Sequence, residues 1–300
     1  MTIQQVVIKR LKLFTKRRSV SLLDGNYDSI FRGKGVELDS LRPYAIGDNI
    51  RDIDWRSTAR TGTVHTRLYT PLRDQRILVI CDSSSSMLIQ SFNKMNKLDA
   101  AYGLIVTLGM LVKKNRDLIA TCHSDNTGKI NISKFSNSNN HIEKLLRAAD
   151  SGLHQTPPNK RPELPQLLQH VMHSLKQRTA IFIISDGLPD SASIKPLLTK
   201  LGVKHQLFWL QLAPSWPFSD QDFIEKPFVD IESGSRVHSD LAHSPKLQQE
   251  WMAQYSNISL SLQQTCRATG TSFGQLEDPI SLPETLRKMF LQARRYAKRK

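Results

Sequence analysis

Cysteine is scarce in this chain of 300 residues, and the three cysteines lie far apart in the sequence, at Cys81, Cys122 and Cys266. They are odd in number and none stands in a C-x-x-C spacing, which argues against a disulfide framework and against a cysteine zinc site. We therefore expect buried thiols in a reducing compartment.

Long apolar runs are also missing. No stretch approaches the roughly 20 continuous apolar residues that span a bilayer, and residues 1–18 lack the uninterrupted apolar segment of a secretory signal. The chain contains neither a G-x-x-x-x-G-K-[ST] loop for ATP nor a G-x-S-x-G nucleophile elbow. These absences favour a cytoplasmic protein and give no support to ATP hydrolysis by the chain itself.

The body of the chain lacks a surplus of either charge. The net charge is +15, but residues 1–18 carry six Lys or Arg and residues 287–300 carry seven, with no acid in either segment. Between these ends, 29 basic residues face 27 acidic ones. No specific nucleic-acid groove is predicted, although the basic ends could make a peripheral contact with an anionic membrane. The simpler interpretation is that they are solvated faces of helices packed on the domain.

What the sequence does contain, from residue 76 onward, is short apolar runs that alternate with amphipathic segments. This pattern indicates strands and crossover helices in a mainly parallel sheet. The predicted strands are residues 77–81, 118–122, 130–133, 180–184, 206–212 and, more weakly, 272–275. The predicted helices are residues 97–114, 141–149, 163–175, 191–201, 245–268 and a terminal one from residue 282, and a small hairpin is predicted over residues 228–238.

Two of the predicted strands end in a carboxylate. The first runs directly into Asp82, Ser84 and Ser86, which spell D-x-S-x-S, and the fourth runs into Ser185 and Asp186. Ligands of open α/β sheets bind at the carboxyl ends of the strands, where the strand order reverses, so the two carboxylates meet there if their strands are neighbours. Carboxylate and hydroxyl oxygens suit a hard divalent cation. The alternative is two independent helix N-caps on neighbouring loops.

These residues resemble the metal-ion-dependent adhesion site of the von Willebrand factor A fold. In that fold D-x-S-x-S follows the first strand, a Thr comes from a middle loop and an Asp follows the fourth strand. Asp82, Ser84, Ser86 and Asp186 match this pattern, and Thr156 stands at about the place of the Thr. The resemblance implies that these five residues hold Mg²⁺, with Mn²⁺ or Ca²⁺ as alternatives, and that an Asp or Glu of a protein partner completes the coordination.

A second resemblance lies in the first 75 residues. Its motifs are Gly33 to Glu37, Leu41 to Tyr44, Gly47-Asp48, Arg51 to Trp55 and Thr58 to Arg60. This spaced pattern resembles the bacterial family catalogued as domain of unknown function 58, whose members pair such a segment with a von Willebrand A-like domain. The resemblance implies a companion role to a MoxR-type AAA+ ATPase.

The same N-terminal segment is rich in acids that a second hypothesis can use. Its carboxylates could form the metal centre of a phosphoesterase or nuclease. They alternate with a similar number of arginines, so an internally paired polar network is the simpler interpretation. The acids are Glu37, Asp39, Asp48, Asp52 and Asp54, and the arginines are Arg42, Arg51, Arg56 and Arg60.

The sequence therefore predicts an α/β protein with a von Willebrand factor A-like, doubly wound, mainly parallel sheet flanked by helices. Residues 1–75 form a small family-specific segment packed on it, residues 76–280 the von Willebrand factor A-like domain, and residues 281–300 a basic C-terminal helix. The expected function is a non-enzymatic, metal-dependent protein-binding adaptor or assembly factor that works with a MoxR-type AAA+ ATPase. A metal-dependent phosphoesterase and an anionic-surface binder that uses the basic ends are the alternatives.

Overall fold

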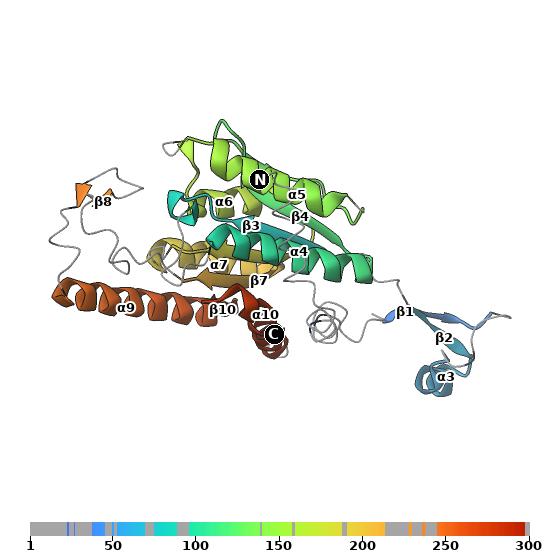
Figure 1. The fold of residues 1–300 in the computed structure, drawn as a ribbon. Helices are drawn as coiled ribbons and strands as arrows, with labels where there is room; N and C mark the ends of the chain where they lie inside the picture. The colour runs from blue at the N-terminus through green and yellow to red at the C-terminus, as the bar shows by residue number, and fades with distance from the viewer. Residues whose placement is uncertain are drawn as a thin grey trace.

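The computed structural model of the chain describes residues 23, 27, 38–45, 50, 53–69, 75–88, 96–138, 140–157, 160–187, 191–213, 228–229, 236–237 and 245–297 (Figure 1). Its elements, in chain order, are β1 (Leu38–Pro43), α3 (Trp55–Thr61), β2 (His65–Tyr69), β3 (Arg76–Cys81), η2 (Ser85–Leu88), α4 (Lys97–Asn115), β4 (Leu118–Ser124), β5 (Ile130–Ile132), α5 (His141–Gln155), α6 (Leu164–Ser174), β6 (Ala180–Ser185), α7 (Ser191–Lys204), β7 (Gln206–Leu212), β8 (Phe228–Val229), β9 (Arg236–Val237), α9 (Pro245–Thr269), β10 (Ser272–Leu276), η5 (Pro279–Ser281) and α10 (Leu282–Ala297).

A six-stranded sheet in the order β10-β7-β6-β3-β4-β5 forms the centre of the protein. All neighbours pair in parallel except β4 and β5, which pair antiparallel. Within this sheet the first strand in the chain is β3, which lies in the middle. The chain continues through β4 to β5 on one side of β3 and then crosses to β6 on the other side. The predicted doubly wound, mainly parallel architecture is confirmed, and all six predicted strands are present.

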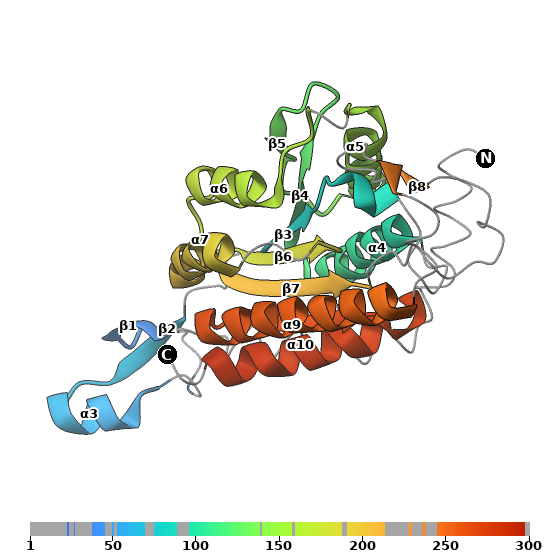
Figure 2. The same cartoon turned by 90° about the vertical axis from the view of Figure 1, so that its left-hand side faces the viewer.

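Both faces of the sheet are buried, because successive residues of a strand point to opposite faces. In β3, Ile77, Val79 and Cys81 belong to one hydrophobic cluster, which contains buried residues of α4, α5 and α10. Leu78 and Ile80 belong to a second cluster, formed with α6, α7 and α9. Figure 2 shows α6 and α7 on one side of β3 and β6, and α4 and α5 on the other. Continuous apolar strands of this kind are typical of parallel sheets covered on both faces.

The terminal helix α10 packs tightly on the edge strand β10. Four residues of α10 are buried, namely Leu286, Met289, Phe290 and Ala293. A glycine is needed opposite them, because a Cβ at Gly274 would lie 2.6 Å from Sδ of Met289. The predicted hairpin is present as two-residue strands, β8 and β9, which pair antiparallel.

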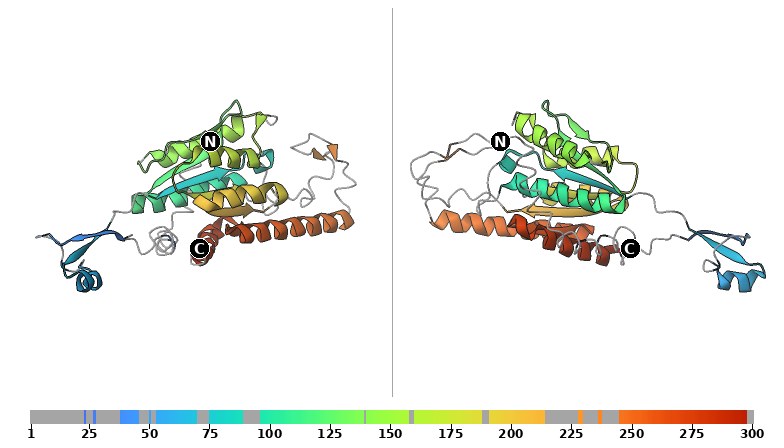
Figure 3. Two further views of the ribbon diagram at one scale, coloured as in Figure 1. Left: turned by 180° about the vertical axis from the view of Figure 1, so that it is seen from behind. Right: turned by 45° about the vertical axis from the view of Figure 1, so that its right-hand side comes forward.

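Residues of the N-terminal segment occur in two places. Leu23 and Tyr27 are fully buried in the cluster that contains α4 and α10, and the Tyr27 hydroxyl donates a hydrogen bond of 2.5 Å to Oδ2 of Asp117. By contrast, β1, α3 and β2 form a small antiparallel unit that stands away from the six-stranded sheet in both views of Figure 3. Leu23 and Tyr27 therefore pack this segment on the domain, and the backbone of Gln75 also bonds to Asp117 and Leu118.

Candidate functional site

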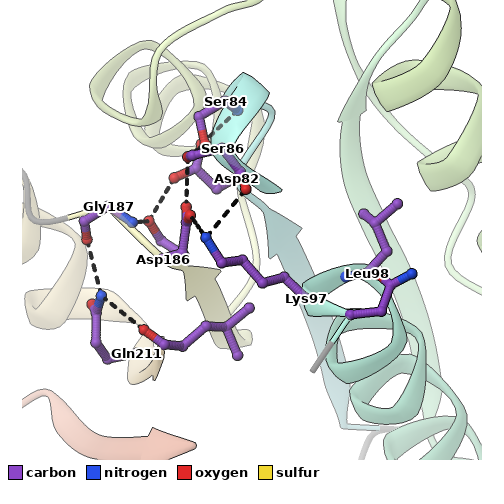
Figure 4. Close-up of polar contacts among 11 residues, drawn as sticks. Asp82, Ser84, Ser86, Lys97, Leu98, Asp186, Gly187 and Gln211 are labelled. Carbon is purple, nitrogen blue, oxygen red and sulfur yellow. Dashed lines mark hydrogen bonds and ion pairs between the residues drawn. The ribbon is translucent and has the colours of Figure 1, made fainter. Parts of the chain in front are cut away.

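Asp82 and Asp186 lie side by side at the reversal of the strand order. β3 and β6 are parallel neighbours, and the backbone N–H of Asp82 donates to the carbonyl of Ile184 at 2.9 Å, which extends their pairing to the end of both strands. Asp82 directly follows β3, and Asp186 directly follows β6. The structure therefore brings together the two carboxylates that the sequence placed at a common sheet edge (Figure 4).

The serines after Asp82 divide into two sets that face different ways. Ser84 and Ser86 face the site: their hydroxyl oxygens lie 3.0 Å apart, and the Ser86 hydroxyl donates to Oδ1 of Asp186 at 2.9 Å. Ser83 faces away and donates to the carbonyl of Pro162 at 2.6 Å. Ser85 faces the same way and accepts from Arg161 at 2.9 Å. The D-x-S-x-S spacing thus has a structural basis, because Ser84 and Ser86 face the site whereas Ser83 and Ser85 do not.

Lys97 is the site residue that sequence reasoning missed. It is the first residue of α4, it is 0% exposed, and its ammonium contacts Oδ2 of Asp186. The same ammonium donates to the backbone carbonyl of Ser86 at 3.2 Å. A signal was present in the sequence, since a lysine in the first turn of a predicted helix is opposed by the helix dipole and needs a compensating partner.

A polar shell fixes the two loops. The Ser185 hydroxyl donates to Oδ2 of Asp82 at 2.5 Å, and the Ser84 backbone N–H donates to Oδ1 of Asp82 at 3.0 Å. Gln211 on β7 donates to the carbonyl of Gly187 at 3.2 Å and accepts from the indole N–H of Trp209 at 3.0 Å. These bonds fix the orientation of the Asp82 carboxylate and hold the start of the loop after β6 in place.

Burial disfavours the charged form of Asp82. Desolvation, with a smaller contribution from the nearby Asp186 charge, raises the pKa of Asp82 to about 6, although hydrogen bonds from Ser185 and Ser84 act in the opposite direction. A carboxylate held under these conditions gains stability from a bound cation, because a nearby positive charge favours its ionised form.

The raised pKa predicts a pH dependence of stability. Because the folded-state pKa lies above the unfolded value, the contribution of Asp82 to stability is fully present below about pH 4 and is lost as the pH rises through about 6. A shift of about two units corresponds to about 3 kcal/mol. The asparagine of the variant Asp82→Asn does not titrate, so in chelator only the wild type should lose this stability as the pH rises from about 4 to about 7. The free energy of unfolding of Asp82→Asn minus that of the wild type, measured by urea denaturation, should therefore increase by about this amount. If this difference in free energy of unfolding is the same at both pH values, the pKa of Asp82 is not raised in the folded protein.

Thr156 lies at the end of α5 and is buried. Its hydroxyl donates to the backbone carbonyl of Asp125 at 2.6 Å. Its own carbonyl accepts from Arg161 at 3.1 Å, and Arg161 also donates to Ser85. Arg161 therefore links Thr156 to the serine loop, while the Thr156 hydroxyl is oriented by Asp125. Whether Thr156 acts as a metal ligand stays a prediction.

The donor set fits a hard divalent cation. The two hydroxyls lie within hydrogen-bond distance of each other, Ser86 also donates to Asp186, and Ser84 makes a side-chain hydrogen bond to Asp82. Both hydroxyls are only partly buried. Such oxygens are the ligands that Mg²⁺ takes while it retains waters. One of the two carboxylates already has a cationic partner, because the Lys97 ammonium forms an ion pair with Asp186.

Of the acids in the N-terminal motif, the structure describes the side chain of Asp54. It is buried and caps α3 by accepting from the Ser57 backbone N–H at 3.0 Å. Glu37, Asp48 and Asp52 lie outside the described residues, and the side chain of Asp39 does too. Trp55, which directly follows Asp54 in the same motif, is 65% exposed. The described part of this motif thus has a structural role at Asp54.

The remaining candidates for metal chemistry have other environments. Cys81, Cys122 and Cys266 are free and buried, as predicted, and burial raises the pKa of each thiol to about 12. Within the described residues, no three or more His, Cys, Asp or Glu side chains are grouped so that they could hold a metal.

None of the described helices has the length and apolarity to cross a membrane.

The strand order, the helices on both faces and the loop after β3 define a von Willebrand factor A-like α/β domain. The chain belongs to the family described as "Protein of unknown function DUF58", which matches residues 40–216. The match extends from β1 to just beyond β7 and contains all five predicted metal ligands.

The curated relatives are uncharacterised proteins. Uncharacterized protein Rv1480 of Mycobacterium tuberculosis (strain H37Rv) is 22% identical over 265 residues, which cover 88% of this chain and 81% of the relative. Uncharacterized protein Mb1516 of Mycobacterium bovis gives the same values.

The solved structures similar to this chain include two bacterial proteins. A von Willebrand factor type A protein from Catenulispora acidiphila has a TM-score of 0.41 and 13% identity, and the match covers 76% of this chain but spans only 44% of that protein. The conserved hypothetical protein BatB from Bacteroides thetaiotaomicron has a TM-score of 0.43 and 13% identity, with 75% of this chain and 99% of BatB covered.

Proposed function

We propose that this protein is a non-enzymatic adaptor or assembly factor of the cytoplasm, which binds a protein partner through a divalent cation. Mg²⁺ is the proposed ion, with Mn²⁺ or Ca²⁺ as alternatives. Its proposed ligands are Asp82, Ser84, Ser86, Thr156 and Asp186, either directly or through water, and an acidic side chain of the partner fills the open position. The proposed partner is a MoxR-type AAA+ ATPase, which rests on the family resemblance.

The observation that supports this proposal is the convergence of Asp82, Ser84, Ser86 and Asp186 at one edge of the sheet. Ser86 donates to Asp186 across 100 positions of sequence, and Ser185 donates to Asp82 across 103. Ser84 and Ser86 are partly exposed, whereas the carboxylates behind them are buried. A cation held there would have the protein carboxylates below it and a side open to a partner.

The phosphoesterase alternative ranks below this one because of Asp54. That carboxylate is engaged as the N-cap of α3, where it accepts the Ser57 backbone N–H. A capping carboxylate of this kind stabilises its helix by about 1 kcal/mol, a sufficient structural reason for an acid at this position.

Partner binding should depend on Asp82 and on the ion together. With a purified MoxR-type ATPase from the same genome as the probe, Asp82→Ala should weaken binding in Mg²⁺ by about 30-fold or more, equivalent to about 2 kcal/mol. Chelator should weaken wild-type binding to the same extent and leave Asp82→Ala unchanged. The measurement is isothermal titration calorimetry with and without Mg²⁺.

Glu143→Ala is the matched control, because it removes a carboxylate whose partner, Arg147, is an exposed residue of the same helix. This variant should bind like the wild type. Equal binding by Asp82→Ala and wild type, with or without Mg²⁺, would refute the metal-bridged contact.

A further inference from the structure

A lysine ammonium already lies in the candidate metal site. Lys97 contacts Asp186 and donates to the carbonyl of Ser86, and both of these residues belong to the proposed ligand set. Figure 4 shows the Lys97 side chain extending from the start of α4 to the carboxylate. The lysine and a divalent ion would therefore interact with the same Asp186 carboxylate.

The position of Lys97 is costly unless Asp186 compensates it. The side chain is 0% exposed, and a buried ammonium loses its hydration. It also lies in the first turn of α4, where the helix dipole opposes a positive charge. Ordinary helix formation does not require a lysine here, since Asn96 caps the helix by accepting from the Leu98 backbone N–H at 3.0 Å. The contacts with Asp186 and with the Ser86 carbonyl hold the ammonium in place, and Asp186 supplies the compensating charge.

The ion pair between Lys97 and Asp186 affects how the site can bind a divalent ion. The site contains two buried carboxylates, Asp82 and Asp186, of which Asp186 is paired with the ammonium. A divalent ion brought to the same carboxylates would be repelled by the ammonium at short range, where the interaction of like charges is strong.

We infer that Lys97 is the resident cation of the site, and that a divalent ion binds only when the Lys97 ammonium gives up its contact with Asp186. The inference rests on the proposed function, because it concerns the same ligands. Lys97 thereby neutralises Asp186 when no ion is bound and lowers the affinity of the site for the ion. The site then alternates between an ammonium-filled form and a metal-filled form, and the second presents an open coordination position to a partner.

The test compares ion binding by wild type, Lys97→Met and a matched control. Methionine keeps the unbranched apolar stem out to Cε but removes the ammonium and its charge. Mg²⁺ and Mn²⁺ are titrated into each full-length protein by calorimetry and by thermal denaturation, at constant ionic strength. Lys97→Met should bind at least about tenfold more tightly than wild type and show the larger rise in midpoint temperature. The control is Lys113→Met in the last turn of the same helix, where the lysine is exposed, and it should bind like wild type.

The outcomes separate this inference from the proposed function. Ion binding by wild type with no gain in Lys97→Met would overturn the inference and leave the metal site standing. Binding by Lys97→Met alone would support the inference and remove metal dependence from the wild-type protein. Absence of binding in both would overturn both. If Lys97→Met does not fold in chelator, Lys97→Gln takes its place, since its amide is an uncharged hydrogen-bond donor, and the same gain in affinity is required.

Discussion

Replacement of Asp186 by alanine should destabilise the protein by about 3–5 kcal/mol in the absence of divalent ions, because it leaves the ammonium of Lys97 buried without its carboxylate. The side chains of this pair are 0% and 3% exposed, so the ammonium left behind is shielded from bulk water. The Ser86 hydroxyl loses its acceptor at the same time. Removal of the Asp186 charge also eases the repulsion on Asp82, but burial is the larger cause of the raised Asp82 pKa, so this relief offsets only part of the loss.

The measurement is urea denaturation of each variant in chelator at neutral pH. Glu143→Ala is again the control: it breaks an ion pair with Arg147 whose side chains are 46% and 56% exposed, and such surface pairs contribute about 0.5 kcal/mol. The double variant Lys97→Met, Asp186→Asn should recover to within about 1 kcal/mol of the wild type, because it removes both charges and leaves an acceptor for Ser86. A loss in Asp186→Ala no larger than that of Glu143→Ala would contradict the buried pair.

Much of the candidate site could be predicted because strand ends are visible in the sequence. An apolar run that stops at Asp82 and another that stops at Asp186 place both carboxylates at one edge of a parallel sheet, whatever the details of the loops. Lys97 could not be assigned in this way. It lies 11 positions beyond Ser86, and no sequence rule states that a lysine in the first turn of a helix will fold back to that edge. Thr156 is intermediate, since its place is set by the loop between α5 and α6, where spacing is a weak guide.

The sheet was predictable for a related reason. The inner strands β3, β6 and β7 are buried on both faces and are largely apolar runs. All six predicted strands are present. The helix predicted over residues 141–149 continues to Gln155 in α5, because helix ends depend on caps that the apolar pattern does not show. The position of the unit formed by β1, α3 and β2 was not predictable, since its interleaved charges and exposed aromatics, such as Trp55, contain no apolar face that indicates a packing direction.

Phe290 should be the residue of the terminal helix with the largest effect on stability. It is fully buried and lies edge-on to the stacked pair Phe182 and Phe208, with ring centroids 6.2 Å and 5.7 Å away. It also meets the edge of Tyr27 at 6.4 Å, so it connects α10, two central strands and a residue of the N-terminal segment. Phe290→Ala should therefore lower the free energy of unfolding by about 3–5 kcal/mol through lost burial and the cavity left behind.

Urea denaturation of Phe290→Ala, beside Leu260→Ala as the control, tests whether α10 is part of the domain or an accessory basic helix. Leu260 lies on α9 and is 55% exposed, so its truncation should change stability by no more than about 0.5 kcal/mol. If both variants lose equally little, α10 contributes only its charges, and the basic C-terminal end becomes the better candidate for an anionic surface contact. If Phe290→Ala shows the expected loss, the docked face of α10 is required by the fold. The arginines on its exposed face are then an outer surface of the same domain that holds Asp82 and Asp186.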